Sequence, residues 1–516
     1  SWLLEAVAPL SAYGERQFSE LSPFPAGNEL AAQARARRIA WLAATVDSSR
    51  LDSVRSILRS VPDVAAAVAA AAIGDVLGDA AFLELRRFCA ALRRADDVLA
   101  GVEGFAPFAN AGATAVGEVL GVAQHDETSF YLADAFDEPL RAARERRARL
   151  HAEFEALRGR AERAIAAALG REELGEEFIV MRADLQGNLP PGVRVIREAP
   201  TYFLCRIAYD EETVTALQRR DDADRAVAEA EERVRGRLSS IVRQHAADLN
   251  AASEALGDLD VLVAAARYAA RYRCAAPEIA TQPVLEFVEA RFLPLEEELS
   301  AAGRPFTALD VALNGPAVLT GPNMGGKSVC LRTCGLIAVC AAYGLPVPAA
   351  RCRVGLFDEI AWLGLGRDER VGGLLSSFAR EVLALKAVFE RGAPRLLLLG
   401  DEFARTTTPH EGKALLIALL ERLRGRAACA LLATHLGGVA AAARVRHFAV
   451  HGLRGIPSRP SGEQIEDVLA ALAASMDYRV GEVSGDEAAA GDAVALAQLL
   501  GMDGDFIAAA YRALSQ

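Results

Sequence analysis

The sequence has no apolar run long enough to cross a membrane. Its longest run, residues 64–73, is rich in alanine and lies between Asp63 and Asp75. A membrane-spanning helix needs about 20 apolar residues, so we expect this run to form a buried helix of a globular protein. The first five residues contain neither a basic leader nor a small-residue cleavage site. We therefore expect a cytoplasmic protein with no membrane partner.

Paired cysteines are also missing. The eight cysteines are scattered, and the closest group, Cys330, Cys334 and Cys340, falls on one expected helix rather than in CxxC pairs. Zinc sites and disulfide frameworks use paired spacings. We therefore expect reduced cysteines that fill the core.

A positive net charge is absent as well. The formal net charge is −12, which argues against a protein that binds nucleic acid over its whole surface. A local basic stripe is compatible with this average. Charge therefore favours other partners over DNA without excluding DNA.

Length and apolar content predict a globular protein of several domains. The chain has 516 residues, of which 52% are hydrophobic and 24% charged, and single cores stop growing well below this length. From residue 28 to residue 169, apolar residues recur every three or four positions, which predicts successive helices. Glycine, proline and Asn110 interrupt this pattern at residues 101–112 and predict a loop.

The middle of the chain has the pattern of an arm with a tip. Residues 140–169 and 211–256 predict two long helices that run side by side. Between them, short apolar stretches separated by turn residues predict strands at 177–182, 193–196 and 202–208.

From residue 283 onward, strands and helices alternate, which is typical of a doubly wound α/β domain. The sequence predicts strands at residues 317–320, 396–399 and 428–433, with helices starting near Lys327 and Gly412. A stretch rich in glycine, proline and serine at residues 452–462 then leads into an expected helical tail.

A phosphate-binding loop is the clearest motif. Residues 320–328 read TGPNMGGKS and satisfy the pattern GxxxxGK[ST] between an apolar strand and a helix. Backbone N–H groups of such a loop turn toward phosphate oxygens, and the start of the following helix adds its positive dipole end. We expect Lys327 to contact the β- and γ-phosphates of ATP and Ser328 to bind Mg²⁺. The remaining loop residues expected to bind ATP are Gly321, Pro322, Asn323, Met324, Gly325 and Gly326.

Acidic residues follow the next strong strand. Residues 396–402 read LLLLGDE, so the strand ends in Asp401 and Glu402. We expect Asp401 to hold Mg²⁺ and Glu402 to orient and deprotonate the attacking water. His435 ends the following strand, where it could sense the γ-phosphate. Together with the loop, these residues predict ATP hydrolysis.

These residues resemble the MutS family of ATPases. TGPNMGGKS is that family's phosphate-binding loop almost letter for letter, and Thr434 with His435 is similar to its switch histidine. The serines before Phe378, with Glu381, resemble its signature segment, which in that family reaches the nucleotide of the partner subunit. By this likeness Ser376 acts at a neighbour's site, and the protein is a homodimer or a heterodimer with a similar subunit. The specific resemblance covers residues 290–436.

The resemblance also implies a domain plan. It gives a helical core at residues 1–139, lever helices at 140–256 with a clamp-like insertion at about 175–210, and a helical return at 257–282. A MutS-type P-loop ATPase domain at 283–455 and a helical dimerisation tail at 456–516 follow. The implied fold class is an all-α core and lever with a small β-containing clamp, plus a C-terminal α/β P-loop NTPase domain.

Departures from the family pattern bear on function. The resemblance does not extend to the family's N-terminal mismatch-reading domain, so we expect no mismatch recognition of the usual kind. Residues 400–412 read GDEFARTTTPHEG where the family commonly has DEIGRGTS. That wording resembles the MutS-related proteins associated with adenosylcobalamin-dependent lysine and ornithine aminomutases. The first hypothesis is therefore an ATPase that remodels and reactivates such a partner enzyme.

A DNA-structure binder is the alternative hypothesis. Its arms would contact phosphates through arginines at residues 141–149 and through Arg219, Arg220 and Arg225. The third hypothesis is an ATPase of the ABC or chromosome-condensation type. It is less well supported, because such ATPases carry an LSGGQ-like string where this chain has the serines before Phe378.

Overall fold

The computed structural model describes residues 2–126, 128–185, 187–322, 325–364, 377–453, 475–483, 494, 497–498 and 501–514. The chain forms two compact units. One contains Ser1–Arg55 and Gly257–Gln516, and the other contains Ser56–Leu256. The division runs through the helical core predicted at residues 1–139. Two helices continue across the boundaries between the units: α4 (Ser48–Ser60) and α10 (Ala246–Arg271).

The unit at residues 56–256 combines helices with one small sheet. Its helices are α5 (Ala65–Ile73), α6 (Asp79–Leu99), α7 (Ala111–Leu120), α8 (Glu138–Ala168) and α9 (Glu211–Gln244), with 3-10 turns η1 (Asp134–Phe136) and η2 (Arg182–Asp184). Its strands are β1 (Glu177–Met181), β2 (Val193–Glu198) and β3 (Tyr202–Ile207), in the antiparallel order β1-β3-β2. The predicted arm with a β tip is therefore confirmed.

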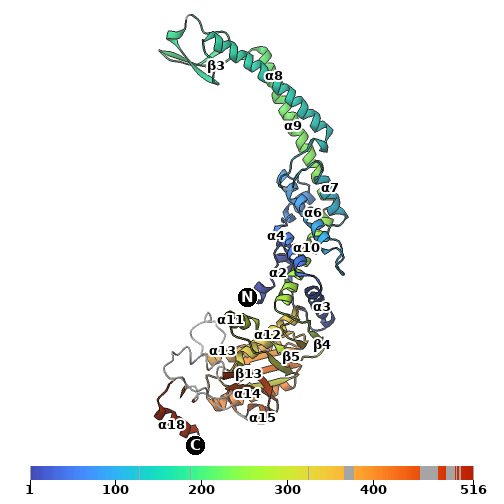
Figure 1. Ribbon diagram of the computed structural model, residues 1–516, viewed down its shortest axis with the longest axis vertical. Helices are drawn as coiled ribbons and strands as arrows, with labels where there is room; N and C mark the ends of the chain where they lie inside the picture. Colours follow the sequence, from blue (N-terminus) through green and yellow to red (C-terminus); the bar gives the residue numbers. More distant parts are fainter. Residues whose placement is uncertain are drawn as a thin grey trace. The chain divides into compact units, whose positions relative to one another are not determined.

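Helices α8 and α9 run side by side, with the small sheet at their end (Figure 1). Asp210 caps the start of α9 by accepting a hydrogen bond from the Thr213 N–H. Phe154, Leu157 and Ala216 form an apolar cluster between the two helices. The second predicted helix, residues 211–256, is in fact divided at His245 into α9 and α10.

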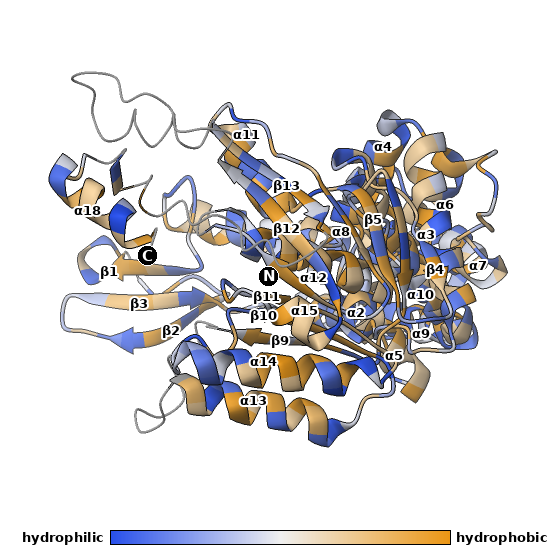
Figure 2. Ribbon diagram, turned by 90° about the horizontal axis from the view of Figure 1, so that it is seen from below, coloured by the Kyte–Doolittle hydropathy of each residue, from blue (hydrophilic) through white to orange (hydrophobic). Residues whose placement is uncertain are grey.

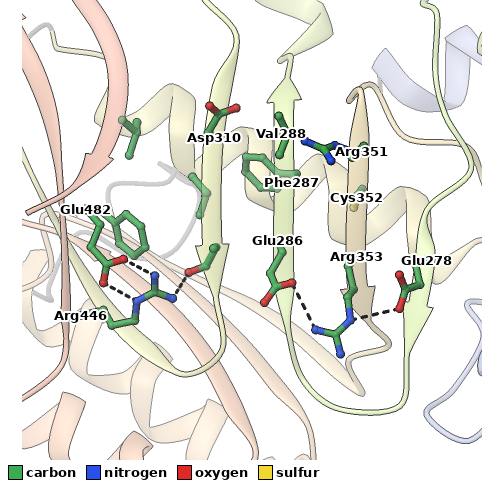
Figure 3. Close-up of a pocket in the computed structure, with 14 residues that line it drawn as sticks. Glu278, Glu286, Phe287, Val288, Asp310, Arg351, Cys352, Arg353, Arg446 and Glu482 are labelled. Carbon is green, nitrogen blue, oxygen red and sulfur yellow. Dashed lines mark hydrogen bonds and ion pairs between the residues drawn. The ribbon is translucent and has the colours of Figure 1, made fainter.

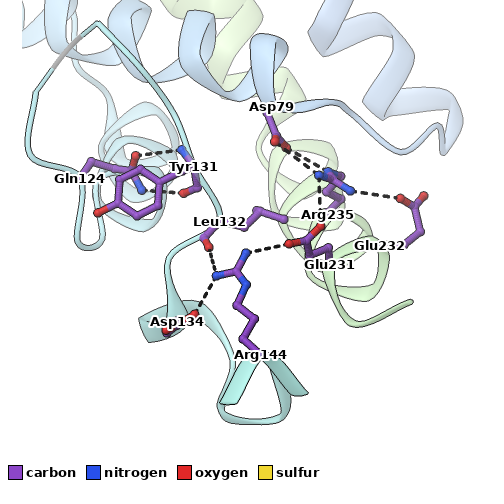
Figure 4. A network of polar contacts seen from close by, with 9 residues as sticks. All are labelled: Asp79, Gln124, Tyr131, Leu132, Asp134, Arg144, Glu231, Glu232 and Arg235. Carbon is purple, nitrogen blue, oxygen red and sulfur yellow. Dashed lines mark hydrogen bonds and ion pairs between the residues drawn. The ribbon is translucent and has the colours of Figure 1, made fainter. Parts of the chain in front are cut away.

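Ion pairs connect α8 with α9 and η1, and α9 with α6 (Figure 4). The Arg144 guanidinium of α8 bridges Glu231 of α9 and Asp134 of η1, with N–O distances of 2.7 Å in both cases. One turn along α9, Arg235 contacts Asp79 in the first turn of α6 at 2.9 Å. These arginines therefore hold helices together within the unit.

The alanine-rich helix α5 is exposed along much of its length, which corrects the prediction of a buried helix. Val68 and Ala71 are buried, whereas the Ile73 side chain is 81% exposed. The helix packs against α9, and its short alanine side chains leave the opposite side in solvent. Within the described residues no single helix is long and apolar enough to cross a membrane; one helix pair reaches the required length, α4 with α5, and it is bent by 51°.

The other unit contains two sheets. The six-stranded sheet has the order β13-β12-β7-β11-β10-β9, and the four-stranded sheet has the order β4-β8-β5-β6. The strands of the larger sheet are β7 (Pro316–Thr320), β9 (Glu359–Gly364), β10 (Leu396–Asp401), β11 (Ala428–Ala433), β12 (Arg446–Leu453) and β13 (Met476–Glu482). Those of the smaller sheet are β4 (Glu278–Ala280), β5 (Leu285–Ala290), β6 (Leu309–Leu313) and β8 (Arg351–Gly355).

Parallel pairing dominates the larger sheet. Strands β9, β10, β11, β7 and β12 pair in parallel, and β13 closes one edge antiparallel to β12. All of β11 and nearly all of β10 is buried, and buried residues of α14 pack against them. Figure 2 shows these strands as mainly hydrophobic, with α13 and α14 beside them. The predicted α/β alternation is therefore confirmed.

The helices of this unit are α1 (Trp2–Ala6), α2 (Ala12–Glu20), α3 (Glu29–Thr45), α11 (Leu293–Ala301), α12 (Lys327–Ala342), α13 (Ser377–Arg391), α14 (Pro409–Arg424), α15 (Val439–Ala443) and α18 (Gly504–Leu514). Helix α14 begins three residues before the predicted Gly412, because Thr408 caps it by accepting from the Glu411 N–H. The predicted helical tail is wrong for β13, whose alternating burial suits a sheet edge.

The N-terminal segment is tied to α10 by one buried carboxylate. Asp260 accepts hydrogen bonds from the Leu10 N–H at 2.9 Å, from the Ser11 N–H at 2.6 Å and from the Ser11 hydroxyl at 2.7 Å. These bonds help to place residues 1–55 in the same unit as residues 257–516. The prediction that the cysteines fill the core is confirmed for six of the eight, which are buried; Cys274 and Cys352 are half-buried.

Candidate nucleotide site

The predicted phosphate-binding loop connects the end of β7 to the start of α12. Gly321 has φ +149°, and a Cβ there would come within 2.9 Å of the Val450 Cβ. Gly326, at the start of α12, has φ +91°, a conformation that favours glycine. Asn323 and Met324 lie outside the described residues. A Cβ at Gly325 would come within 2.9 Å of the Pro322 carbonyl oxygen. The loop is thus a close turn in which all three predicted glycines are required by conformation or space.

Lys327 places its ammonium group inside this turn. The residue is only 5% exposed, and its Nζ donates to the carbonyl oxygens of Gly321 at 2.9 Å and Pro322 at 3.1 Å. Burial lowers the pKa of Lys327, while the negative charges of Glu402 and Asp401 act in the opposite direction. The loop therefore holds a desolvated cation close to two carboxylates. Ser328 is the next residue, in the first turn of α12.

Asp401 and Glu402 lie where β10 ends. Strand β10 pairs in parallel with β9 and β11, so that Asp401 lies opposite Gly364 and Ala433. Gly364 has φ +137°, and a Cβ at this position would approach the Asp401 carbonyl oxygen to 2.7 Å. The glycine therefore lets the end of β9 pass close to Asp401.

Glu402 begins a tight turn. It has φ +55°, which is unusual for a residue with a side chain. Its N–H donates to the Ala433 carbonyl oxygen at 3.0 Å. Its side chain is 18% exposed and pairs with Arg405, with an N–O distance of 3.0 Å. A mostly buried carboxylate at the edge of the sheet is thus held by one arginine.

His435 follows β11 and is exposed. The preceding residue, Thr434, is buried; its N–H donates to the Leu319 carbonyl oxygen of β7 at 3.0 Å, and its hydroxyl accepts from the Leu436 N–H at 3.1 Å. Because β7, β10 and β11 are parallel neighbours, their carboxyl ends share one edge of the sheet. The loop with Lys327, the two acids and His435 are therefore brought to the same edge. Ser376 lies outside the described residues.

Two contacts at this edge were not predicted as part of the site. The buried Thr320 hydroxyl, at the end of β7, lies 2.8 Å from Nε2 of His447 on β12. Glu381 of α13 is also buried, and its Oε2 accepts from the Ala404 N–H at 2.8 Å. The sequence gives no local signal for either contact, since the partners are 127 and 23 residues apart.

A separate hollow is lined by the smaller sheet together with β12 and β13 of the larger one (Figure 3). It has a volume of about 710 Å³. Arg353 pairs with Glu278 and Glu286 there, and Arg446 pairs with Glu482. Most of its charged side chains therefore already bind one another. It contains none of the loop residues or acids of the nucleotide site.

A strand, a glycine turn with a buried lysine, a helix, and acids on a neighbouring strand form the arrangement that is typical of P-loop nucleotide-binding domains. Residues 317–453 match the family described as MutS domain V. This match confirms the resemblance to the MutS family, which is a family of ATPases.

Similar proteins carry MutS names. The chain is 33% identical over 207 residues to "Endonuclease MutS2" of Geobacillus thermodenitrificans, a match that covers 40% of this chain and 26% of that protein. It is 28% identical over 472 residues to "DNA mismatch repair protein MutS" of Nitrobacter hamburgensis, covering 84% of this chain and 50% of that protein. The "DNA mismatch repair protein MutS" of Granulibacter bethesdensis is 35% identical over 225 residues. The chain thus spans about a quarter to a half of the length of these relatives.

Proposed function

We propose that the chain hydrolyses ATP with Mg²⁺ at the edge where β7, β10 and β11 end. The observation that carries this proposal is the buried ammonium of Lys327 inside the glycine turn, near Asp401 and Glu402. A phosphate group would replace the two carbonyl oxygens as the partner of that cation, and the backbone N–H groups of the loop would supply further donors. Release of phosphate from ATP by the purified chain, with and without Mg²⁺, tests the proposal.

Each residue has a role set by its chemistry. Ser328 and Asp401 offer the hard oxygen ligands that Mg²⁺ prefers, and Mg²⁺ commonly takes only one or two protein ligands beside the substrate phosphates. Within the described residues no cluster of three or more metal-ligating side chains occurs, which agrees with such a shared site. Glu402 would accept a proton from the attacking water, and His435 would sense the γ-phosphate.

We propose further that the active form is a dimer with composite sites, in which Ser376 completes the site of the neighbouring subunit. Ser376→Ala should then slow hydrolysis, and so should Glu402→Gln. When the two variants are mixed, a mixed dimer regains one intact site, which combines Glu402 of one subunit with Ser376 of the other. We expect the phosphate-release rate of the mixture to exceed that of either variant alone.

The matched control mixes each variant with itself at the same total concentration. If the mixture stays as slow as the two separate variants, or if a monomer is fully active, the composite site is wrong. Sedimentation of the same samples with bound ATP gives the oligomeric state.

For the client, we propose a partner protein. The charge balance of the arm supports this choice, since residues 138–244 contain 20 arginines and 20 carboxylates. Of the arginines that would contact DNA, Arg141 pairs with Glu138 and Glu145, Arg220 with Asp221, and Arg225 with Asp222. An adenosylcobalamin-dependent aminomutase is the candidate client that the sequence resemblance suggests, and reactivation of that enzyme is the proposed result.

DNA is the second candidate, favoured by the names of the similar proteins. Within the described part of the chain, Arg146, Arg147 and Arg149 are exposed and have no ion pair, so they are the residues of α8 that could contact phosphates. If the client is a protein, duplex or branched DNA should leave the ATPase rate unchanged.

A salt series separates the two candidates. Binding through phosphates loses affinity with a slope of roughly −0.9 in log K against log salt for each phosphate neutralised. We expect fluorescence anisotropy with labelled duplex to show at most weak binding at physiological salt. Tight binding with a steep slope would instead show that the arm binds DNA. In that case the triple variant R146A, R147A and R149A should have a less steep slope, by the contribution of about three phosphates.

A further inference from the structure

Helix α13 places one carboxylate in an otherwise apolar contact. Val388 is buried in the core cluster of the larger sheet, and Phe378, Leu385 and Phe389 pack against that cluster. Glu381 lies on the same stripe of the helix by its spacing from Phe378, Leu385 and Val388, and it is only 7% exposed. A carboxylate in such a place is costly unless it is hydrogen-bonded. The Glu381 carboxylate therefore needs a hydrogen-bond donor.

The partner is the turn that carries Glu402. Oε2 of Glu381 accepts a hydrogen bond from the Ala404 N–H at 2.8 Å. Ala404 has φ +62° and Glu402 has φ +55°, so two residues out of three adopt a left-handed conformation without being glycine. Such conformations persist where the surroundings hold them in place. Glu381 supplies one of these restraints, and the bond from the Glu402 N–H to Ala433 supplies another.

We propose that Glu381 is a positioning residue for hydrolysis: it fixes the left-handed turn at Ala404 and thereby aims the Glu402 carboxylate. This inference rests on the proposed ATPase function and on Glu402 as its base. Glu381 acts through the backbone of Ala404, and Lys327 with its loop is held by separate contacts. Loss of Glu381 should therefore lower the rate of the chemical step without weakening nucleotide binding.

Glu381→Met is the most informative variant. Methionine has a similar length and suits the apolar stripe, so the helix should remain packed while the acceptor for the Ala404 N–H is lost. We expect kcat to fall by about tenfold to a hundredfold, because small displacements of a reacting group cost that much. We expect KM, the Kd of a fluorescent ATP analogue and the Tm to change little. Glu381→Gln keeps an acceptor oxygen and should retain most of the wild-type kcat.

Controls on the same helix and in the same assay make the result decisive. Glu390 of α13 is exposed, and Glu390→Met should behave like the wild type. If Glu381→Met turns over at the wild-type rate, or if its kcat falls only together with ATP affinity and Tm, Glu381 has no positioning role. A wild-type chain that releases no phosphate would overturn the proposed ATPase function itself. Failure of the proposed function can therefore be told apart from failure of the positioning role of Glu381.

Discussion

Lys327→Ala is expected to abolish measurable ATP binding. The ammonium lies in the glycine turn, where it donates to the Gly321 and Pro322 carbonyl oxygens. Each charge-assisted hydrogen bond to a phosphate contributes about 1.5–3 kcal/mol. Loss of two such bonds should weaken the Kd more than a hundredfold. Titration of a fluorescent ATP analogue measures the change directly.

Lys386→Ala is the matched control for this prediction. Lys386 is exposed and pairs with Glu390 on α13, so its removal should leave the affinity for ATP unchanged. Thermal melting of both variants shows whether either change unfolds the domain. Undiminished ATP affinity in a folded Lys327→Ala variant would refute the assignment of the loop.

Glu402→Gln should stop turnover while ATP remains bound. The amide has the shape of the carboxylate but cannot take up the proton of the attacking water. General-base catalysis commonly contributes about 10²–10⁴-fold to the rate, so we expect kcat to fall by that factor. On the same preparation, phosphate release should fall while binding of the fluorescent analogue is retained.

Two further variants separate the effect of Glu402 from the effects of other charged residues. Glu421→Gln removes an exposed carboxylate of α14 and should have no effect on either measurement. Arg405→Ala removes the ion pair of Glu402 and tests whether this pair matters for turnover. Normal turnover by Glu402→Gln would exclude Glu402 as the base and would leave the catalytic group unassigned.

Much of the α/β unit could be predicted because its signals are local. The strand before the loop, the leucine run of β10 and the apolar run of β11 are continuous stretches, and the observed bounds agree with them closely. The motif with Gly321 and Lys327 carries its own chemistry in consecutive residues. The strands at the tip of the arm were also predictable, because turn residues separate them.

Features that depend on distant partners were missed. Strand β13 is stabilised by pairing with β12, and nothing within its seven residues predicts that neighbour. Residues 1–55 look like the helices that follow them, yet they belong to the unit of residues 257–516, and the bonds from Leu10 and Ser11 to Asp260 lie within that unit. The exposure of α5 likewise depends on what packs against it.

The same limit applies to the site. Sequence order places Asp401, Glu402 and His435 at the ends of strands, and parallel pairing brings those ends together. The left-handed conformations of Glu402 and Ala404 and the support from Glu381 arise only after α13 packs on the sheet. No periodic pattern predicts a carboxylate that accepts a hydrogen bond from another segment's backbone.

Phosphate release by the purified wild-type chain, measured beside Lys327→Ala and Glu402→Gln, tests most directly whether this one site hydrolyses ATP. We predict steady release that requires Mg²⁺, disappears on chelation with EDTA and is lost in both variants. Release that continues unchanged in both variants, or a wild-type chain that binds ATP and never releases phosphate, would show that this site does not hydrolyse ATP.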